Sequence, residues 1–419
     1  MNKKPFLRAF SFVSRYNQSM NSKAIVYFQS GGPTAVINSS LYGVYQEVMA
    51  HPDVFSAFYV SHYGVEGLIR DDLYDFGQED PEEMRYLLQT PGQVIGSSRQ
   101  KLPDFDDPAF AAIVKTIEKH HIGYILTNGG NDSMNTCARL HAFFVKRGMD
   151  VKVIGIPKTI DNDLALTDHS VGYPSAARHI MDAAMMALLD VVSFRNGKVI
   201  FMETMGRNTG WLTASVALLP KSIRPDAFYL PEQKWDTDEF LKNIQAIYAK
   251  KRSAVIVLSE GVPLEKRNHE AVDSFGHASL EGVSGTAADL VAAKLGLHSR
   301  VISDTSLQRS DAFSITKVDR QEAIAVGQFA VRALCQGVSG KMVALKRVSS
   351  KPYHAECVLV DLDEVADAVR ALPTSWILSN HEMAPEFIDY LAPLVKETET
   401  VQYEDGFLRM PRLKFISVK

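Results

Sequence analysis

The chain has few cysteines for its length: only Cys137, Cys335 and Cys357 occur among its 419 residues. Their wide spacing excludes a cysteine-based zinc cluster, and their odd number excludes a complete disulfide set. We therefore expect a cytoplasmic protein, in a reducing setting. No apolar run approaches the roughly 20 residues that a membrane-spanning helix needs, so no membrane partner is expected.

An excess of positive charge is absent as well. The formal net charge is −4 at pH 7, which gives no reason to expect nucleic acid or an anionic membrane surface as a partner. Any binding of phosphate groups must then come from local sites. With 46% hydrophobic residues, a chain of this length can bury a large core divided between two or three domains.

Four common catalytic motifs are missing. The sequence contains no P-loop pattern Gly-x-x-x-x-Gly-Lys-Ser/Thr, no dinucleotide-binding glycine fingerprint, no His-Glu-x-x-His and no Gly-x-Ser-x-Gly. These absences disfavour a P-loop kinase, a standard dehydrogenase, a zinc protease and an esterase.

The most informative stretch is residues 122–172, which reads as strand, glycine turn, helix, strand and acidic turn. The carboxyl ends of neighbouring parallel strands lie at one edge of a sheet, so we expect the turns at 128–133 and 157–163 to lie side by side. Polar residues of the first turn are expected to cap the helix, and Gly148 to end it. The buried face of this helix is expected to hold Met134, Cys137, Ala138, Phe144 and Val145.

The chemistry of the two turns suits an anionic ligand. Gly129 and Gly130 let the backbone approach a phosphate, and the helix that follows presents unpaired N–H groups. In the second turn Lys158 stands near the carboxylates of Asp161 and Asp163, a combination that suits an anionic donor, a metal and a general base. Each turn alone is also ordinary turn chemistry, but their expected adjacency favours a site.

Other strands also lead into turns with candidate residues. The strand at 24–28 leads to Gly31, which can offer its N–H to a phosphate or form a plain β–α turn. The strand at 198–204 leads to a glycine turn that opens a helix. The strand at 254–258 delivers Glu260, whose carboxylate can accept hydrogen bonds from sugar hydroxyls.

The recurring units predict an α/β fold with two doubly wound, Rossmann-like three-layer domains and an active site in the cleft between them. We expect a disordered or mis-assigned extension at 1–23, a first domain at 24–175 with a return segment at about 310–345, a second domain at 176–309, and a C-terminal extension at 346–419.

Further elements are expected from periodicity. A long helix is predicted from about residue 174 to residue 192, strands at 341–345 and 357–360, and a helix at 362–371. The buried face of the long helix is expected to hold Ile180, Met181, Ala184, Met185, Leu188 and Val192.

Gly-Gly-Asn-Asp-Ser at 129–133, Pro-Lys-Thr-Ile-Asp-Asn-Asp at 157–163 and Met-Gly-Arg at 205–207 resemble the phosphofructokinase family. The resemblance runs from about residue 24 to residue 340. ATP-using members carry Gly at two places where the pyrophosphate-dependent branch has Asp and Lys, as here at Asp132 and Lys158. The resemblance therefore implies Mg²⁺-dependent, reversible transfer of a phosphoryl group from pyrophosphate to the 1-hydroxyl of fructose 6-phosphate, in glycolysis.

The resemblance also implies roles at the donor end of the site. Arg99, which alone would read as half of a solvated charge pair with Lys101, would bind the transferred phosphoryl group. Asp161 would be the general base. Asn131 stands where the family has an Asp near Mg²⁺, and an amide oxygen is a weaker ligand than a carboxylate. The implied donor, catalytic and metal residues are Gly31, Arg99, Asn131, Asp132, Lys158, Asp161 and Asp163.

For the sugar, the resemblance implies that Lys198 and Arg300 reach the site of a neighbouring subunit, and hence a homodimer or homotetramer. Ser306 stands where relatives carry His or Tyr. An ATP-dependent phosphofructokinase and a catalytically silent sugar-phosphate sensor remain as alternatives. The implied sugar residues are Thr159, Ile160, Asp161, Lys198, Met205, Gly206, Arg207, Glu260, Arg300, Ser306 and Arg309.

Overall fold

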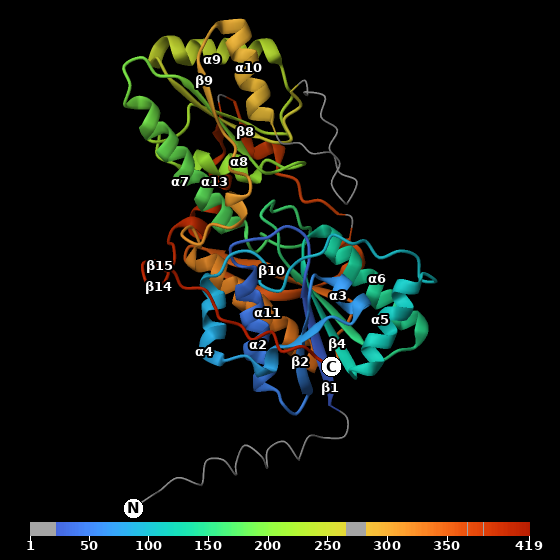
Figure 1. Ribbon diagram of the computed structural model, residues 1–419. Helices are drawn as coiled ribbons and strands as arrows, with labels where there is room; N and C mark the ends of the chain where they lie inside the picture. The colour runs from blue at the N-terminus through green and yellow to red at the C-terminus, as the bar shows by residue number, and fades with distance from the viewer. Residues whose placement is uncertain (1–21, 265–281, 367, 380) are drawn as a thin grey trace, which may run out of the picture.

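The computed structural model describes residues 22–264, 282–366, 368–379 and 381–419. Most of the extension expected at 1–23 therefore lies outside the described residues. The chain is a mixed α/β protein with one seven-stranded and one four-stranded sheet, and the α/β class predicted from the sequence is confirmed. Figure 1 shows the larger sheet and its helices below and the smaller sheet with its helices above.

The seven-stranded sheet has the strand order β11-β10-β5-β4-β1-β2-β3. Its central neighbours pair in parallel, whereas the edge pairs β10–β11 and β2–β3 are antiparallel. The strands are β1 (Lys23–Gln29), β2 (Phe55–Ser61), β3 (Leu73–Asp75), β4 (Ile122–Gly129), β5 (Lys152–Pro157), β10 (Lys341–Ser350) and β11 (Tyr353–Asp361).

Helices cover both faces of this sheet, because alternate strand residues point to opposite sides. Ile25 and Tyr27 of β1 pack with α2 and α11 on one face, and Val26 and Phe28 pack with the helices of the other face. The first face carries α2 (Ile37–Ala50) and α11 (Lys317–Cys335); the second carries α3 (Val65–Arg70), α5 (Pro108–Lys119), α6 (Asn131–Arg147) and α12 (Leu362–Val365).

The four-stranded sheet is parallel throughout, in the order β7-β8-β6-β9. Phe201 of β6 packs with α9 and α10 on one face, and Met202 packs with α7, α8 and α13 on the other. The strands are β6 (Val199–Thr204), β7 (Ala227–Tyr229), β8 (Ala254–Ser259) and β9 (Ser299–Ile302). The helices are α7 (Tyr173–Val192), α8 (Trp211–Ala214), α9 (Thr237–Lys251), α10 (Val283–Leu295) and α13 (Pro385–Val395).

Short elements complete the fold. The α4 helix (Pro81–Met84) follows an N-cap at Asp80, and two small hairpins lie in the C-terminal region. No helix in the described part of the chain has the length and apolar character needed to cross a lipid bilayer. The remaining elements are η1 (Phe76–Gln78), η2 (Arg85–Gln89), η3 (Ser215–Leu218), η4 (Leu307–Arg309), η5 (Thr374–Trp376), β12 (Ile377–Leu378), β13 (Glu382–Met383), β14 (Tyr403–Glu404) and β15 (Phe407–Leu408).

Three sequence predictions about helices were wrong in detail. Val145 of α6 and Val192 of α7 are exposed, and Leu140 and Val191 are buried in their helices instead. Val191 and Val192 differ by one position, which turns a side chain by roughly 100° around the helix, and the five positions from Leu140 to Val145 turn it by roughly 140°. The helix expected at 362–371 is only the four-residue α12, because the chain then pairs with the loop at Leu164.

Candidate active site

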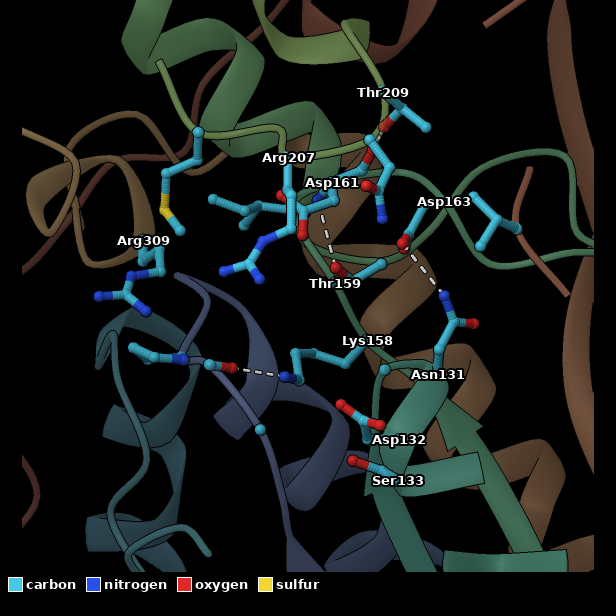
Figure 2. A pocket seen from close by; sticks show the side chains of 18 of the residues that line it. Asn131, Asp132, Ser133, Lys158, Thr159, Asp161, Asp163, Arg207, Thr209 and Arg309 are labelled. Carbon is cyan, nitrogen blue, oxygen red and sulfur yellow. Dashed lines mark hydrogen bonds between the residues drawn. The ribbon is translucent and has the colours of Figure 1, made fainter. Parts of the chain in front are cut away.

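A cavity of about 380 Å³ is lined mostly by residues that follow the strands of both sheets (Figure 2). The strands β4 and β5 pair in parallel and bring Gly129 opposite Pro157, which confirms that the two polar turns lie side by side. Thirteen of the residues expected at the site line this cavity: Gly31, Arg99, Asn131, Asp132, Lys158, Thr159, Ile160, Asp161, Asp163, Met205, Arg207, Glu260 and Arg309.

Four expected residues do not line the cavity. Gly206 lies directly behind it and donates its N–H to Glu260 Oε1 at 3.2 Å. Ser306 is solvent-exposed. Lys198 precedes the six-residue strand β6, whereas Met205 follows it, and such a strand spans about 20 Å. Lys198 and Arg300, which lie near the amino ends of β6 and β9, are therefore remote from the cavity of their own chain.

Gly31 lies in the glycine turn that follows β1, at the point where this turn meets the turn that carries Arg99. The Gly31 carbonyl accepts a hydrogen bond from Ser97 Oγ at 2.7 Å. The Gly31 N–H, expected to face a phosphate, donates to the Ser98 carbonyl at 3.3 Å. Gly31 has φ 77°, and a Cβ atom there would lie 3.5 Å from Lys158 Nζ. Its contribution is a bare backbone beside Lys158 rather than a free donor.

Lys158 is the buried cation of the cavity, with 2% of its surface exposed. Its ammonium donates to the Gly32 carbonyl, and Figure 2 shows it pointing toward the glycine turn that follows β1. Burial lowers the pKa of Lys158 to about 7, against the opposing effect of Asp161. An anion entering the cavity would favour the charged form again, so this lysine becomes a full cation when a phosphate binds.

Asp161 and Asp163 lie in the turn that follows β5, and both line the cavity. Asp161 Oδ1 is buried and has no hydrogen-bond partner among the described residues. Burial raises the pKa of the Asp161 carboxyl. Burial, and then the neighbouring Asp161 charge, raise the pKa of Asp163 to about 7. Two carboxylates with raised pKa values in one cavity are suited to accepting a proton or binding a cation.

The N-terminus of α6 faces this pair. Its N-cap is Gly130, with no side-chain cap, so the expected polar cap is wrong. By contrast, α5 and α9 each begin with an aspartate that accepts a backbone N–H. The Ser133 N–H donates to the Gly130 carbonyl at 3.0 Å, so the first-turn N–H groups of Asn131 and Asp132 are the ones that could meet a ligand. Asn131 Nδ2 donates to Asp163 Oδ2 at 3.0 Å, and its Oδ1 is buried without a partner in the described structure.

Residues at the ends of β6 and β8 close the opposite side of the cavity. Ser259 Oγ donates to the Gly206 carbonyl at 2.6 Å. A Cβ at Gly261 would lie 2.0 Å from the Arg207 carbonyl, so the two turns pack as closely as backbones allow. Burial, with Asp161 nearby, raises the pKa of Glu260 to about 7. Thr209 Oγ1 donates to the Asp161 carbonyl at 3.2 Å and joins the two sides.

Arg309 is placed by residues that the sequence did not reveal. The neighbouring Gln308 is buried, accepts the Met205 N–H at 3.0 Å and donates to the Glu203 carbonyl at 2.9 Å. Arg309 Nε is buried and has no partner within the described residues. Figure 2 shows the guanidinium groups of Arg207 and Arg309 entering the cavity above Lys158. This end of the cavity is therefore strongly cationic.

His179 of α7 clamps the loop that carries Arg309. Its Nδ1 lies 2.8 Å from Asp311 Oδ2, and its Nε2 lies 3.2 Å from Asp304 Oδ2. Burial opposes the charged imidazolium, but hydrogen bonds and charges of the two carboxylates outweigh it and raise the pKa of His179 to about 9. Protonated His179, with two N–H donors, therefore joins both ends of the loop.

We expect His179→Gln to destabilise the protein most at about pH 6.5. The raised pKa of His179 stabilises the folded state fully at a pH below its unfolded-state pKa of about 6.5. This stabilisation disappears as the pH rises past its folded-state pKa of about 9. The difference in unfolding free energy from the parent should fall from at most about 3 kcal/mol toward zero. Urea unfolding at pH 6.5, 8 and 9.5, with the exposed His354→Gln as control, measures it. A difference independent of pH would contradict the clamp.

The chain is similar to known proteins over most of its length. The family described as phosphofructokinase matches residues 24–334. A pyrophosphate–fructose 6-phosphate 1-phosphotransferase of Halomonas elongata is 33% identical over 92% of this chain and 95% of its own. A sulfofructose kinase of Alkalicoccus urumqiensis is 34% identical over 83% of this chain and 90% of its own. The crystal structure of a pyrophosphate-dependent phosphofructokinase from Nitrosospira multiformis has a TM-score of 0.86 and 31% identity, over 95% of this chain and 98% of its own.

Proposed function

Because this chain belongs to the phosphofructokinase family, we propose that it transfers a phosphoryl group reversibly between pyrophosphate and the 1-hydroxyl of fructose 6-phosphate. The observation that carries the choice of donor is Lys158, buried in the cavity with Asp132 close by on α6. Lys158 supplies positive charge to a compact anionic donor. Asp132 occupies space and adds negative charge where a nucleotide would continue.

The donor lies between the α6 N-terminus and Lys158. Arg99 and Lys158 pair with its phosphate oxygens, and the N–H groups of Asn131 and Asp132 at the start of α6 add backbone donors. Binding restores the charge of Lys158, whose pKa is about 7 in the buried cavity. The bridging oxygen of pyrophosphate then leaves with phosphate as the new bond forms, and Lys158 stabilises the charge that develops on it.

The proton of the 1-hydroxyl passes to Asp161. Asp161 Oδ1 is buried and unpaired in the described structure, so it is available to accept the hydroxyl hydrogen bond. The sugar oxygen attacks the terminal phosphorus, the bond to the bridging oxygen breaks, and Asp161 holds the proton. In reverse, protonated Asp161 returns the proton as the sugar oxygen leaves. The raised pKa of this carboxyl suits both directions.

The site also fits Mg²⁺, which the family generally uses. No cluster of three or more His, Cys, Asp or Glu side chains suited to a metal occurs in the described ranges. Mg²⁺, however, is commonly held by one or two carboxylates together with substrate phosphates. Asp163 and the unpaired Asn131 Oδ1 supply such oxygens. Bound there with the donor, the ion neutralises charge on the phosphate oxygens.

Fructose 6-phosphate lies with its 1-hydroxyl at Asp161 and its 6-phosphate toward Arg309. The turn at Met205, Gly206 and Arg207, together with Thr159 and Ile160, holds the sugar, and the Glu260 carboxylate accepts sugar hydroxyls. Each sheet with its helices forms a doubly wound domain, and the substrate cleft lies between the two. The cavity lining supports this division, because the donor residues follow the larger sheet and most sugar residues follow the smaller one.

Lys198 and Arg300 complete the 6-phosphate site of a neighbouring subunit, so the enzyme is a homo-oligomer. Both are remote from their own cavity. Lys198 Nζ lies 5.6 Å from the ring centre of Phe194. Phe194 and the α7 residues Met186 and Leu189 leave 52% to 59% of their surface exposed, as expected of an apolar contact between copies. Mixing inactive Asp161→Ser and Arg300→Ser chains tests this proposal. Hybrid oligomers should recover activity, and hybrids that form without activity would contradict shared sites.

The donor assay tests the proposed function directly. Purified protein, fructose 6-phosphate and Mg²⁺ are supplied with pyrophosphate or ATP, and fructose 1,6-bisphosphate is measured. We expect turnover with pyrophosphate and little with ATP. Turnover with ATP alone would favour the ATP-dependent alternative, and none with either would favour the silent sensor. A parallel arm with sulfofructose is justified by the 34% identity to the protein named sulfofructose kinase.

A further inference from the structure

The loop between Asp161 and Gly172 is held by a part of the chain beyond the family match, which ends at residue 334. Val369 forms an antiparallel bridge with Leu164. The Arg370 N–H donates to the Asp163 carbonyl at 2.7 Å, and its guanidinium Nη1 donates to the Asn162 carbonyl at 3.2 Å. The residues that follow Asp161 are thus held one after another by a short C-terminal segment.

Tyr390 of α13 makes a second attachment to the same loop. Its hydroxyl accepts a hydrogen bond from Asn162 Nδ2 at 3.0 Å and donates to the Asp168 carbonyl at 3.1 Å. It also lies 3.4 Å from a guanidinium nitrogen of Arg370. One donor and two acceptor positions are therefore all used, in a side chain that is 7% exposed. The hydroxyl fixes the separation between Asn162 and Asp168.

Asn162 has a conformation that needs this support. Its φ is 57°, in the left-handed region that non-glycine residues seldom occupy. Its side-chain oxygen accepts the Ser170 N–H at 2.9 Å, while its side-chain nitrogen meets Tyr390. Because Asn162 stands between Asp161 and Asp163, its backbone conformation decides where both carboxylates point.

Arg370 also connects the loop to the sugar side of the cavity. Its guanidinium lies 4.2 Å from the ring centre of Trp211, at the start of α8. Trp211 Nε1 donates to the Arg370 carbonyl at 3.2 Å. Two residues before Trp211, Thr209 binds the Asp161 carbonyl. A shift of Arg370 would therefore move the loop of Asp161 relative to the turn that holds the sugar.

We propose that Arg370 and Tyr390 are positioning residues for phosphoryl transfer: they fix Asn162 and thereby aim Asp161 and Asp163 into the cavity. This inference rests on the proposed function for its kinetic part. Arg370 and Tyr390 are not among the residues that line the cavity. Their loss should reduce turnover more than binding, because displacement of a reacting group by about 1 Å can cost a hundredfold in rate.

The test compares Tyr390→Phe and Arg370→Met with matched controls in the same C-terminal region, Tyr403→Phe and Arg412→Met. Tyr403 and Arg412 are exposed; Tyr403 pairs with Leu408, and the Arg412 guanidinium pairs with Glu404, in the same C-terminal region. We expect kcat to fall about ten- to a hundredfold in the first pair, with KM for both substrates within about threefold. Arg370→Lys, which keeps the charge near Trp211, should lie between. The controls should match the parent.

Hydrogen exchange of the amides in residues 159–172 provides a readout that needs no turnover. Exchange should rise in Tyr390→Phe and Arg370→Met and stay unchanged in the controls. Unchanged exchange in Tyr390→Phe, which keeps the ring and its packing, would overturn the inference, as would normal kcat despite raised exchange. If Arg370→Met does not fold, Tyr390→Phe decides. Parent protein without pyrophosphate activity would refute the proposed function, while the exchange result would still decide whether these residues hold the loop.

Discussion

Asp161→Ser is expected to lose roughly two to four decades of kcat, the range that a positioned general base contributes. The parent carboxyl is buried, its Oδ1 has no partner among the described residues, and burial raises its pKa. A serine hydroxyl cannot hold the proton of the sugar 1-hydroxyl at neutral pH. The loop itself should survive, because its contacts to Thr209 and Arg370 use backbone atoms.

The measurement is steady-state turnover together with calorimetric binding of fructose 6-phosphate. Binding should stay within a few-fold of the parent, since Arg207, Glu260 and Arg309 are untouched. Asp106 is an exposed aspartate on the side of the larger sheet. The matched control is therefore Asp106→Ser, which should be fully active. Near-normal turnover in Asp161→Ser would show that another group takes the proton. Loss of binding equal to loss of turnover would show a substrate-holding role instead.

Much of the site was predictable because its signals are local. Each candidate turn directly follows a strand, and strands that pair in parallel bring such turns to one edge whatever the helices do. The register that sets Gly129 opposite Pro157 therefore follows from two short segments of sequence. Lys158, Asp161 and Asp163 belong to one such turn. The correct pairing of β4 with β5 is enough to place these three residues beside the turn at 128–133.

The supporting residues could not be predicted because their partners are distant in the chain. His179 binds aspartates 125 and 132 residues away, and Tyr390 binds Asn162 across 228 residues. A lone histidine on a helix and a tyrosine in an apolar helix face carry no local sign of these contacts. Val369 and Arg370 show the same effect in reverse. Their sequence favours a helix, but the bridge of Val369 with Leu164 and the hydrogen bond of the Arg370 N–H to the Asp163 carbonyl hold them outside one.

The choice of donor should depend on Lys158 and Asp132 separately, because in the proposed reaction Lys158 pairs with pyrophosphate whereas Asp132 excludes a nucleotide. Lys158 is the buried cation beside Gly31 and Gly32, and removal of such preorganised charge commonly costs about 3 kcal/mol in the transition state. We expect Lys158→Gly to lose about two decades of kcat with pyrophosphate. Lys158→Met, which keeps most of the packing volume, should lose nearly as much, since charge and not volume is the cause. A fully active Lys158→Met would contradict the role of the charge.

Asp132 should act by exclusion. It stands in the first turn of α6, where the resemblance to ATP-using members implies room for the next phosphate of a nucleotide; here its side chain fills that room, and its carboxylate repels the phosphate. Asp132→Gly should therefore admit ATP weakly while pyrophosphate still reacts, and Asp132→Gly with Lys158→Gly should favour ATP further. Competition of ATP against pyrophosphate in the parent and the three variants measures the shift. The asymmetry is decisive: if Lys158→Gly alone admits ATP as well as Asp132→Gly does, the two residues share one steric role. If ATP stays excluded from all of the variants, the barrier to the nucleotide lies outside both turns.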